Sequence, residues 1–332
     1  MKKLINAPEN VVTEALSAFA VVHGDLVRAD LENALCLRRD PLPDGQVALI
    51  SGGGSGHEPL HGGFVGDGML AAAVLGDVFA SPNADQVLAA CVASDAGGGV
   101  LLIVKNYTGD VINFKLAAEL AEDEDIEVAV VIVDDDTALP KGDGKGPGRR
   151  GTAATVFVEK IAGALAAEGG SLADVRALAE RVVAASGSIG FALTSCTTPM
   201  AGRPTFDLGA DEIEFGVGIH GEQGIGRRPM AGAAELAEQA VDHLLEDLQP
   251  PSGAEVLVLT NGLGGTPSSE LYLFHGEVER LLTDRGLQPV RRLVGPYVTS
   301  LDMAGASVSL LVLDDELTRL WDAPASTPAF VR

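Results

Sequence analysis

Short apolar runs alternate with helical patterns through the first half of this chain, and this alternation constrains the fold more than any other feature. Four such runs lie at 47–50, 69–75, 99–104 and 126–133. A strand covered on both faces of a sheet shows a continuous apolar run, and helices between successive strands provide parallel crossovers. The first half is therefore predicted to form a doubly wound, largely parallel sheet.

The second half continues the alternation. Strands are predicted at 189–193, 213–219, 256–260, 290–294 and 308–313, with helices at 236–248 and 268–285. Because 332 residues is long for one hydrophobic core, two domains are expected, and Ser186-Gly187 is interpreted as their linker. We predict an α/β fold of two domains, 1–186 and 187–332, each with a central β-sheet flanked by helices.

A glycine-rich stretch, Ser-Gly-Gly-Gly-Ser-Gly-His-Glu-Pro at 51–59, follows the first of these strands. Its glycines are expected to form the turn at the carboxyl end of that strand, where ligands bind in open α/β sheets. Glycine lets a ligand approach the backbone closely, and bare N–H groups can cradle oxygen atoms. The alternative is a glycine-rich turn with an exposed histidine. His57, Glu58 and a second histidine, His61, favour a functional site.

Three familiar motifs are absent from the sequence. A dinucleotide fingerprint counted from Gly54 would need glycine where Pro59 stands, and a nucleophile elbow around Ser55 would need glycine in place of His57. No phosphate-binding loop occurs, since Lys145 is followed by glycine. The chain is therefore expected to carry no nucleotide-binding loop of its own.

Further polar residues follow predicted strands. Lys105 and Asp110 bound a polar cluster after the run 99–104, and His220 follows the strand 213–219. Alternatively, Lys105 and Asp110 form an ion pair at a helix start, where the helix dipole favours Asp. Taken alone, His220 could equally be a polar residue that is hydrogen-bonded within a glycine-rich loop and has no functional role.

Two charged segments allow more than one interpretation. Arg149 and Arg150 are adjacent, and either bind phosphate or are surface charges that hold an acidic partner region. The acidic run 134–136 lies at a strand end. A metal role is conceivable there, but a solvated acidic turn is favoured, so no metal ligand is predicted.

A formal charge of −24 argues against nucleic-acid and anionic-membrane partners, which need basic patches. Three widely spaced cysteines suit a reducing compartment and give no metal-ligand pattern. The start of the chain shows no long apolar region, and no run of about 18 apolar residues follows. A cytoplasmic location is expected.

Four blocks in order resemble one family, the dihydroxyacetone-binding K subunit of dihydroxyacetone kinases. They cover most of the chain and lie at 51–59 with 66–82, 105–114, 148–155 with Lys160, and 214–224. The blocks at 105–110 and 218–222 are the most specific. Departures from the family pattern lie at Leu60, Gly62, Gln223 and Asn261-Gly262. The changes beside the two histidine motifs leave the sugar preference open.

The resemblance implies that His220 binds the substrate carbonyl covalently as a hemiaminal, which would exclude polyols such as glycerol. Imidazole is a competent nucleophile when it is neutral. The resemblance also implies that His57 is the general base, with an ordinary pKa near about 6.5 that suits the task. The resemblance further implies that Asp110 forms a hydrogen bond with a terminal hydroxyl of the substrate and takes part in proton transfer. It implies that Lys105 donates to a substrate oxygen.

The amides of Gly54, Ser55 and Gly56 would fix the triose. The implied activity is that of a phosphotransferase of the glycerone kinase type. A separate L subunit is expected to carry ADP or ATP with Mg²⁺. That subunit either is phosphorylated through the phosphotransferase system or uses ATP. No cofactor is expected in this chain. A homodimer is implied by the family alone. The alternatives are a non-catalytic ketose-sensing paralogue and a kinase subunit for a four-carbon ketose such as erythrulose.

Overall fold

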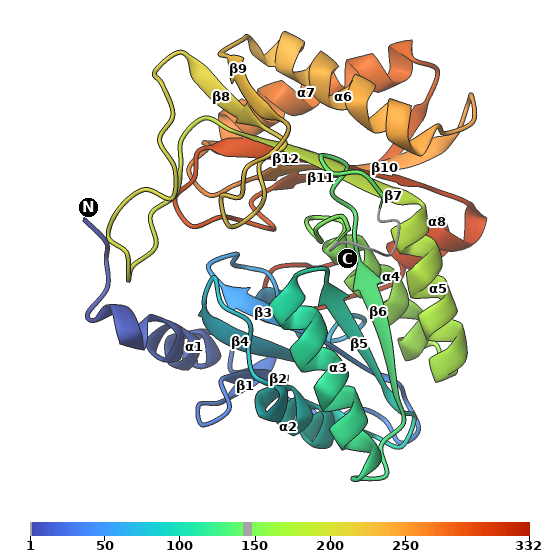
Figure 1. Cartoon of the computed structure of the whole chain (residues 1–332). Helices are drawn as coiled ribbons and strands as arrows, with labels where there is room; N and C mark the ends of the chain where they lie inside the picture. The colour runs from blue at the N-terminus through green and yellow to red at the C-terminus, as the bar shows by residue number, and fades with distance from the viewer. Residues whose placement is uncertain (1, 142–147) are drawn as a thin grey trace. The chain divides into compact units, whose positions relative to one another are not determined.

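The computed structural model describes residues 2–141 and 148–332 (Figure 1). The chain divides into two compact units, each built on one six-stranded sheet. The first unit comprises Met1–Val133, Thr155–Val182 and Leu317–Arg332, and the second comprises Asp134–Ala154 and Val183–Glu316. Two α/β domains, each with a central sheet flanked by helices, were predicted, and this fold class is confirmed. Both units are discontinuous in sequence, and the functional division into 1–186 and 187–332 stays a prediction.

The sheet of the first unit has the order β1-β2-β4-β3-β5-β6. Its strands are β1 Val27–Asp30, β2 Leu35–Arg38, β3 Ala48–Ser55, β4 Ala72–Val78, β5 Val100–Lys105 and β6 Val128–Val133. The four strands predicted from apolar runs pair in parallel, in the order β4-β3-β5-β6. The two strands that were not predicted, β1 and β2, add an antiparallel edge.

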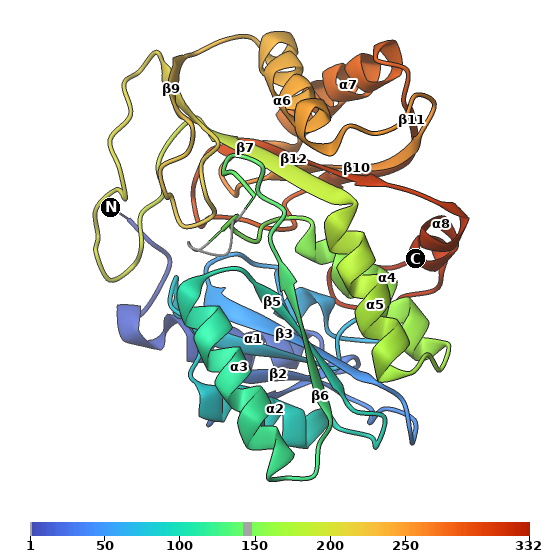
Figure 2. The same ribbon diagram turned by 45° about the vertical axis from the view of Figure 1, so that its right-hand side comes forward.

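Helices cover both faces of this sheet. The elements outside the sheet are η1 Pro8–Asn10, α1 Val11–Val22, η2 Gly62–Phe64, α2 Ala84–Ser94, α3 Thr108–Glu122, α4 Thr155–Ala167, α5 Leu172–Ala184 and α8 Asp315–Asp322. Ile50 and Leu102 belong to the apolar cluster that the sheet forms with α2 and α3 (Figure 2). Because side chains alternate along a strand, Ser51 and Lys105 point to the other face, where α4 contacts β3 and β5.

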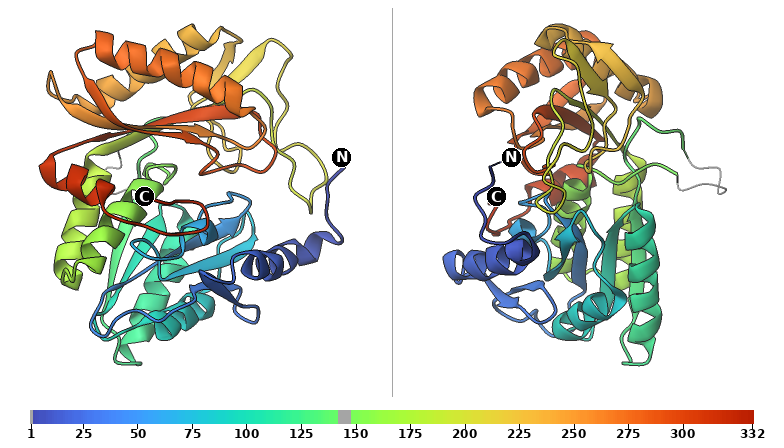
Figure 3. Two further views of the ribbon diagram at one scale, coloured as in Figure 1. Left: turned by 180° about the vertical axis from the view of Figure 1, so that it is seen from behind. Right: turned by 60° about the vertical axis from the view of Figure 1, so that its left-hand side comes forward.

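The sheet of the second unit has the order β11-β10-β12-β7-β8-β9, and only β10 and β11 pair in parallel among its described strands. The strands are β7 Ser186–Ala192, β8 Glu212–Phe215, β9 Gly226–Pro229, β10 Glu255–Gly262, β11 Gln288–Gly295 and β12 Gly305–Val312. Helices α6 Ala233–Leu248 and α7 Ser268–Asp284 pack on one face of this sheet (Figure 3).

Two predictions for the second unit were wrong. The expected linker, Ser186-Gly187, lies inside β7, where hydrogen-bonded neighbours bury it. The strand predicted at 213–219 ends at Phe215, because Gly216 adopts φ 79° and turns the backbone out of the ladder. His220 therefore lies in a loop and not directly after a strand. No helix among residues 2–141 and 148–332 is long and apolar enough to cross a membrane.

Candidate functional site

The first three glycines of the 51–59 stretch, at 52–54, lie within β3, which reaches Ser55, so the prediction that they form the turn was wrong; only Gly56 lies in the turn. The physical reason is close packing of neighbouring backbone. A Cβ atom on Gly52 would lie 2.5 Å from the carbonyl oxygen of Val74, and one on Gly54 would lie 2.6 Å from the amide nitrogen of Ala80. Glycine is therefore needed here for close approach within the strand, and the turn comes only after Ser55.

His57 follows this strand and has no exposed surface. Its ring stacks on Phe79 with a centroid separation of 5.1 Å and an interplanar angle of 14°. The turn is held on either side, since the Ser55 hydroxyl donates to Gly76 O at 2.7 Å and the Gly56 amide donates to Glu58 Oε1 at 2.9 Å. The alternative of a solvent-exposed histidine in a glycine turn is therefore contradicted.

Lys105 and Asp110 lie beside the same strand and are both buried. Lys105, the last residue of β5, donates from Nζ to Gly52 O at 3.0 Å. Asp110 lies in the first turn of α3. A Cβ atom on Gly53 would lie 2.6 Å from Lys105 Nζ and 3.2 Å from Asp110 Oδ2, so both side chains converge on this glycine. Burial lowers the pKa of Lys105, and the charges of Asp110 and Glu159 oppose that shift.

Two further titratable residues lie in a row with Lys105: His61 contacts it, and Glu159 contacts His61. His61 Nε2 lies 2.5 Å from Lys105 Nζ, and His61 Nδ1 lies 2.6 Å from Glu159 Oε1. The sequence showed His61 as a second histidine beside the glycines, but it gave no role to Glu159. A glutamate within an apolar helical segment was the available signal, because carboxylates are almost never fully buried unless they are paired.

His220 lies in the second unit and is held by a carboxylate two residues away. Its Nδ1 is 2.8 Å from Glu222 Oε1, and its backbone amide donates to Glu222 Oε2 at 2.9 Å. Burial raises the pKa of Glu222, but the hydrogen bonds and charge of His220 outweigh it and the net pKa is lowered. A carboxylate at Nδ1 favours the tautomer with the proton on Nδ1, which leaves the ring lone pair on Nε2.

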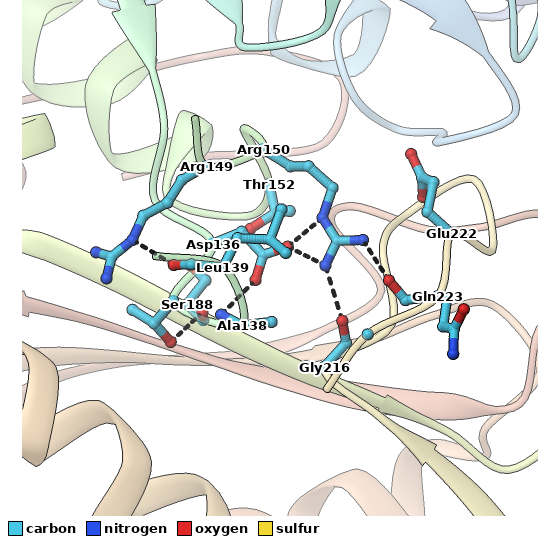
Figure 4. Close-up of polar contacts among 12 residues, drawn as sticks. Asp136, Ala138, Leu139, Arg149, Arg150, Thr152, Ser188, Gly216, Glu222 and Gln223 are labelled. Atoms are coloured by element: carbon cyan, nitrogen blue, oxygen red, sulfur yellow. Dashed lines mark hydrogen bonds and ion pairs between the residues drawn. The ribbon is translucent and has the colours of Figure 1, made fainter. Parts of the chain in front are cut away.

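Arg150 braces the backbone on both sides of His220 (Figure 4). Its guanidinium donates to Gly216 O at 2.8 Å and to Gln223 O at 3.4 Å, and its Nε donates to Asp136 Oδ2 at 2.6 Å. Burial raises the pKa of Asp136 to about 6, against the charge of Arg150. Because the contact at position 223 uses only the backbone carbonyl, the departure from the family pattern at Gln223 leaves it intact.

The neighbouring charged residues are also buried and paired within the second unit. Arg149 donates to Asp247 Oδ2 at 2.9 Å and to Leu139 O at 2.8 Å. The Asp135 carboxylate accepts from the Thr152 hydroxyl at 2.7 Å. The idea of a solvated acidic turn was thus wrong for Asp135 and Asp136, and the two arginines are not surface charges. No group of three or more potential metal ligands occurs in the described part of the chain.

The structure therefore brings three of the predicted site residues, His57, Lys105 and Asp110, beside the glycine strand of the first unit. It places His220 with Glu222 and Arg150 in the second unit. The expectation that the two histidines act on one substrate stays a prediction.

Comparison with known proteins adds an independent finding. The sequence profile of the Dak1 domain matches residues 17–329. The chain is 48% identical over 316 residues to the "PTS-dependent dihydroxyacetone kinase 1, dihydroxyacetone-binding subunit DhaK" of Listeria innocua, covering 95% of each chain. It is 43% identical over 353 residues to the "PEP-dependent dihydroxyacetone kinase, dihydroxyacetone-binding subunit DhaK" of Escherichia coli, covering 99% of each.

Solved structures are similar over almost the whole chain as well. The dihydroxyacetone kinase from C. freundii in complex with AMP-PNP and Mg²⁺ matches with a TM-score of 0.88 and 37% identity, covering 99% of this chain and 61% of that one. The dihydroxyacetone kinase operon co-activator Dha-DhaQ matches with a TM-score of 0.90 and 34% identity, covering 96% of this chain and 98% of that one.

Proposed function

Because the chain belongs to the Dak1 domain family, we propose that it is the dihydroxyacetone-binding subunit of a dihydroxyacetone kinase. Such a subunit is part of a phosphotransferase that converts dihydroxyacetone to dihydroxyacetone phosphate. The chain spans nearly the full length of two relatives that are named as such subunits. Its two sets of polar residues, one buried beside β3 and one half-buried around His220, suit two separate tasks, removal of a hydroxyl proton and carbonyl capture.

Carbonyl capture falls to His220. The Nε2 lone pair forms the bond to the carbonyl carbon as the C=O π bond breaks and its electron pair moves to oxygen. The Nδ1 proton passes to the Glu222 carboxylate, 2.8 Å away, and a proton returns from that carboxyl through water to the oxygen, so the ring ends neutral, Glu222 is regenerated and no net proton is gained. Only an aldehyde or ketone can be held in this way. Glycerol has no carbonyl and is rejected on that ground. The selectivity therefore does not depend on the roughly 1–3 kcal/mol of binding free energy by which a pocket distinguishes ligands that differ in one small group.

Proton removal falls to His57, supported by residues around the glycine strand. The buried imidazole takes the proton of the hydroxyl that attacks phosphorus, a step worth roughly 10²–10⁴-fold in rate. Asp110 accepts a hydrogen bond from the same end of the substrate, and Lys105 donates to a substrate oxygen. The amides of Gly54, Ser55 and Gly56 lie at the end of β3 to fix the triose.

The phosphoryl donor is assigned to a separate L subunit that carries ADP or ATP with Mg²⁺. Support comes from the longer C. freundii kinase, which binds AMP-PNP and Mg²⁺ and extends well beyond the match to this chain. Donors charged through the phosphotransferase system and donors that use ATP both fit this arrangement. A homodimer of this subunit belongs to the same proposal.

The Glu222–His220 contact is the observation that supports covalent capture most directly, and intact-mass spectrometry tests it. We expect the mass of the protein to rise by one whole dihydroxyacetone, because a hemiaminal forms by addition without loss of water. His220→Ala should abolish the adduct. His243→Gln is a matched control, since His243 lies in the same unit and contacts Thr137 O at 2.9 Å. An adduct that survives His220→Ala, or no adduct on the parent protein, would refute covalent capture.

Two other functions have specific support. The similarity to an operon co-activator favours a ketose-sensing paralogue that binds its ligand without phosphorylating it. Adduct formation without phosphoryl transfer from any L subunit would favour this function. A tomato relative named "Putative 3,4-dihydroxy-2-butanone kinase" is 46% identical over 98% of this chain, which favours a four-carbon ketose such as erythrulose. The relative rates on the two ketoses decide between those substrates.

A further inference from the structure

Three buried titratable side chains from different elements form a continuous row in the first unit. Glu159 comes from α4, His61 from the segment after β3, and Lys105 from the end of β5. Glu159 Oε1 is 2.6 Å from His61 Nδ1, and His61 Nε2 is 2.5 Å from Lys105 Nζ. Glu159 and Lys105 are at most 1% exposed, and His61 is 6% exposed. The function proposed above uses only Lys105.

The two contacts of His61 are coupled through its ring protons. A neutral imidazole carries one proton, on either Nδ1 or Nε2. If Nε2 accepts from Lys105, then Nδ1–H donates to Glu159. If Nε2–H instead donates to Lys105, then Nδ1 accepts from Glu159, and the glutamic acid must carry a proton. The state of Lys105 therefore depends on the state of Glu159, although no contact joins them directly among the described residues.

Burial disfavours the charged form of each of the three groups. Burial raises the pKa of Glu159 to about 8, against the Lys105 charge and the Ser51 hydroxyl. Burial also lowers the pKa of His61 well below its usual value, with further lowering by Lys105 and His57. For Lys105 the same burial effect is opposed by Asp110 and Glu159. Asp110 from α3, His57 from the turn and Ser51 from β3 are thus the groups that face the row.

We propose that Glu159 and His61 form a buried proton relay to Lys105, which sets the charge that Lys105 presents beside Gly52 and Asp110. In one arrangement Lys105 is an ammonium, His61 carries its proton on Nδ1, and Glu159 is a carboxylate. One proton then moves from Nζ to Nε2, and the Nδ1 proton moves to Oε1. The products are a neutral amine, the other imidazole tautomer and a carboxylic acid. No proton enters or leaves, and no bond between heavy atoms changes.

The relay bears on the proposed phosphoryl transfer through Lys105 alone, so its catalytic consequence rests on that proposed function. An ammonium donates more strongly to Gly52 O, 3.0 Å away, and to a substrate oxygen. A neutral amine can accept a proton instead. Glu159 and His61 are therefore positioning residues, since they act through Lys105 and not on substrate.

Glu159→Gln tests the relay with little change in shape. The glutamine carbonyl can still accept from Nδ1–H, but it cannot take up a proton. The probe is the infrared C=O stretching band of a buried carboxylic acid, followed as the pH is raised through about 8. Above about pH 8 the row gives up one proton to solvent, so Glu159 becomes a carboxylate and no partner in the row can return a proton to it. We expect the band of the parent protein to disappear over this range and to be missing in Glu159→Gln. The pH profile of phosphoryl transfer, with an L subunit that supports the parent protein, should lose its inflection near 8 in the variant.

Lys160→Met is the matched control, because Lys160 is the next residue of α4, and burial lowers its pKa to about 8 as well. Its Nζ donates to Leu320 O at 2.8 Å, away from the row. The control should keep both the infrared band and the inflection. Identical pH profiles in the parent and in Glu159→Gln would overturn the relay, as would a parent band that does not change with pH. The infrared measurement needs no substrate, so it gives a result even if no ketose is phosphorylated, and the pH dependence of the parent band gives a result even if the variant fails to fold.

Discussion

Arg150→Met is expected to destabilise the second unit and to slow capture of the ketone by His220. Arg150 is 8% exposed, and Asp136 is 3% exposed. The substitution removes three hydrogen bonds and leaves the Asp136 carboxylate buried without its cation. Breaking a buried pair by removing one partner costs about 3–5 kcal/mol. Because the pKa of Asp136 is already about 6, protonation limits the loss. We expect the free energy of unfolding to fall by about 3 kcal/mol at neutral pH.

The sign of the pH dependence follows from Asp136. Its folded pKa is raised from 3.8 to about 6, so the group favours the folded state below the unfolded pKa and loses this contribution as pH rises through about 6. Below about pH 4 the carboxyl is neutral in both proteins, and the ion pair is missing in both. The difference between the parent and Arg150→Met should therefore shrink as pH falls from neutral toward about 4.

Urea unfolding at a series of pH values measures this difference, and adduct formation with dihydroxyacetone measures capture. Asp136→Asn and the double variant complete a mutant cycle, in which the double variant should be more stable than the sum of the single losses predicts. A loss in Arg150→Met that is the same at every pH would refute the argument, as would a cycle without coupling. An unchanged rate of adduct formation in the folded variant would show that Arg150 does not hold the His220 loop.

Two more perturbations follow from particular contacts. Gly53→Ala places a Cβ atom 2.6 Å from Lys105 Nζ at a residue with φ 148°, so the rate of phosphoryl transfer should fall sharply. Gly226→Ala is the matched control for backbone strain, because Gly226 has φ 144° and no heavy atom lies within 4 Å of its Cβ position. The rate of phosphoryl transfer is measured for both variants under conditions where they are equally stable. An equal loss of rate in the two variants would contradict this prediction. The thiols of Cys36 and Cys91 are buried, and burial raises the pKa of each to about 12, so they should resist alkylation at neutral pH until the protein unfolds. Labelling of the native protein at the rate of a free thiol would refute that reasoning.

The apolar runs predicted the parallel core of the first sheet because strands covered on both faces need continuous apolar sequence. The edge strands β1 and β2 were missed, since β1 has only one buried residue, Val27, and polar neighbours interrupt its pattern. The glycines of β3 were assigned to a turn because glycine weakens isolated strands. Their place in the strand depends on contacts with Val74 and Ala80, which no local pattern contains.

The candidate site was partly predictable for the same reason. His57 follows β3 and Lys105 is the last residue of β5, and the carboxyl ends of such neighbouring parallel strands meet at one edge of a sheet. Glu159 could not be placed, because almost all of α4 is buried and its periodicity does not show which face meets the site. The roles of Arg149 and Arg150 were undecided from sequence, since no local pattern shows their acidic partners: Asp247, 98 residues away, pairs with Arg149, and Asp136, 14 residues away, pairs with Arg150.

The return of the C-terminal segment to the first unit affects how this protein is made. Trp321 is fully buried and packs edge-on against Phe157 of α4, with ring centroids 5.9 Å apart. The hydrogen bond that Lys160 Nζ donates to Leu320 O likewise forms only when the C-terminal segment is in place. During synthesis on the ribosome, the first unit therefore lacks part of its core until the second unit has been translated. Its first 182 residues, expressed alone, would expose an incomplete apolar surface to chaperones and proteases.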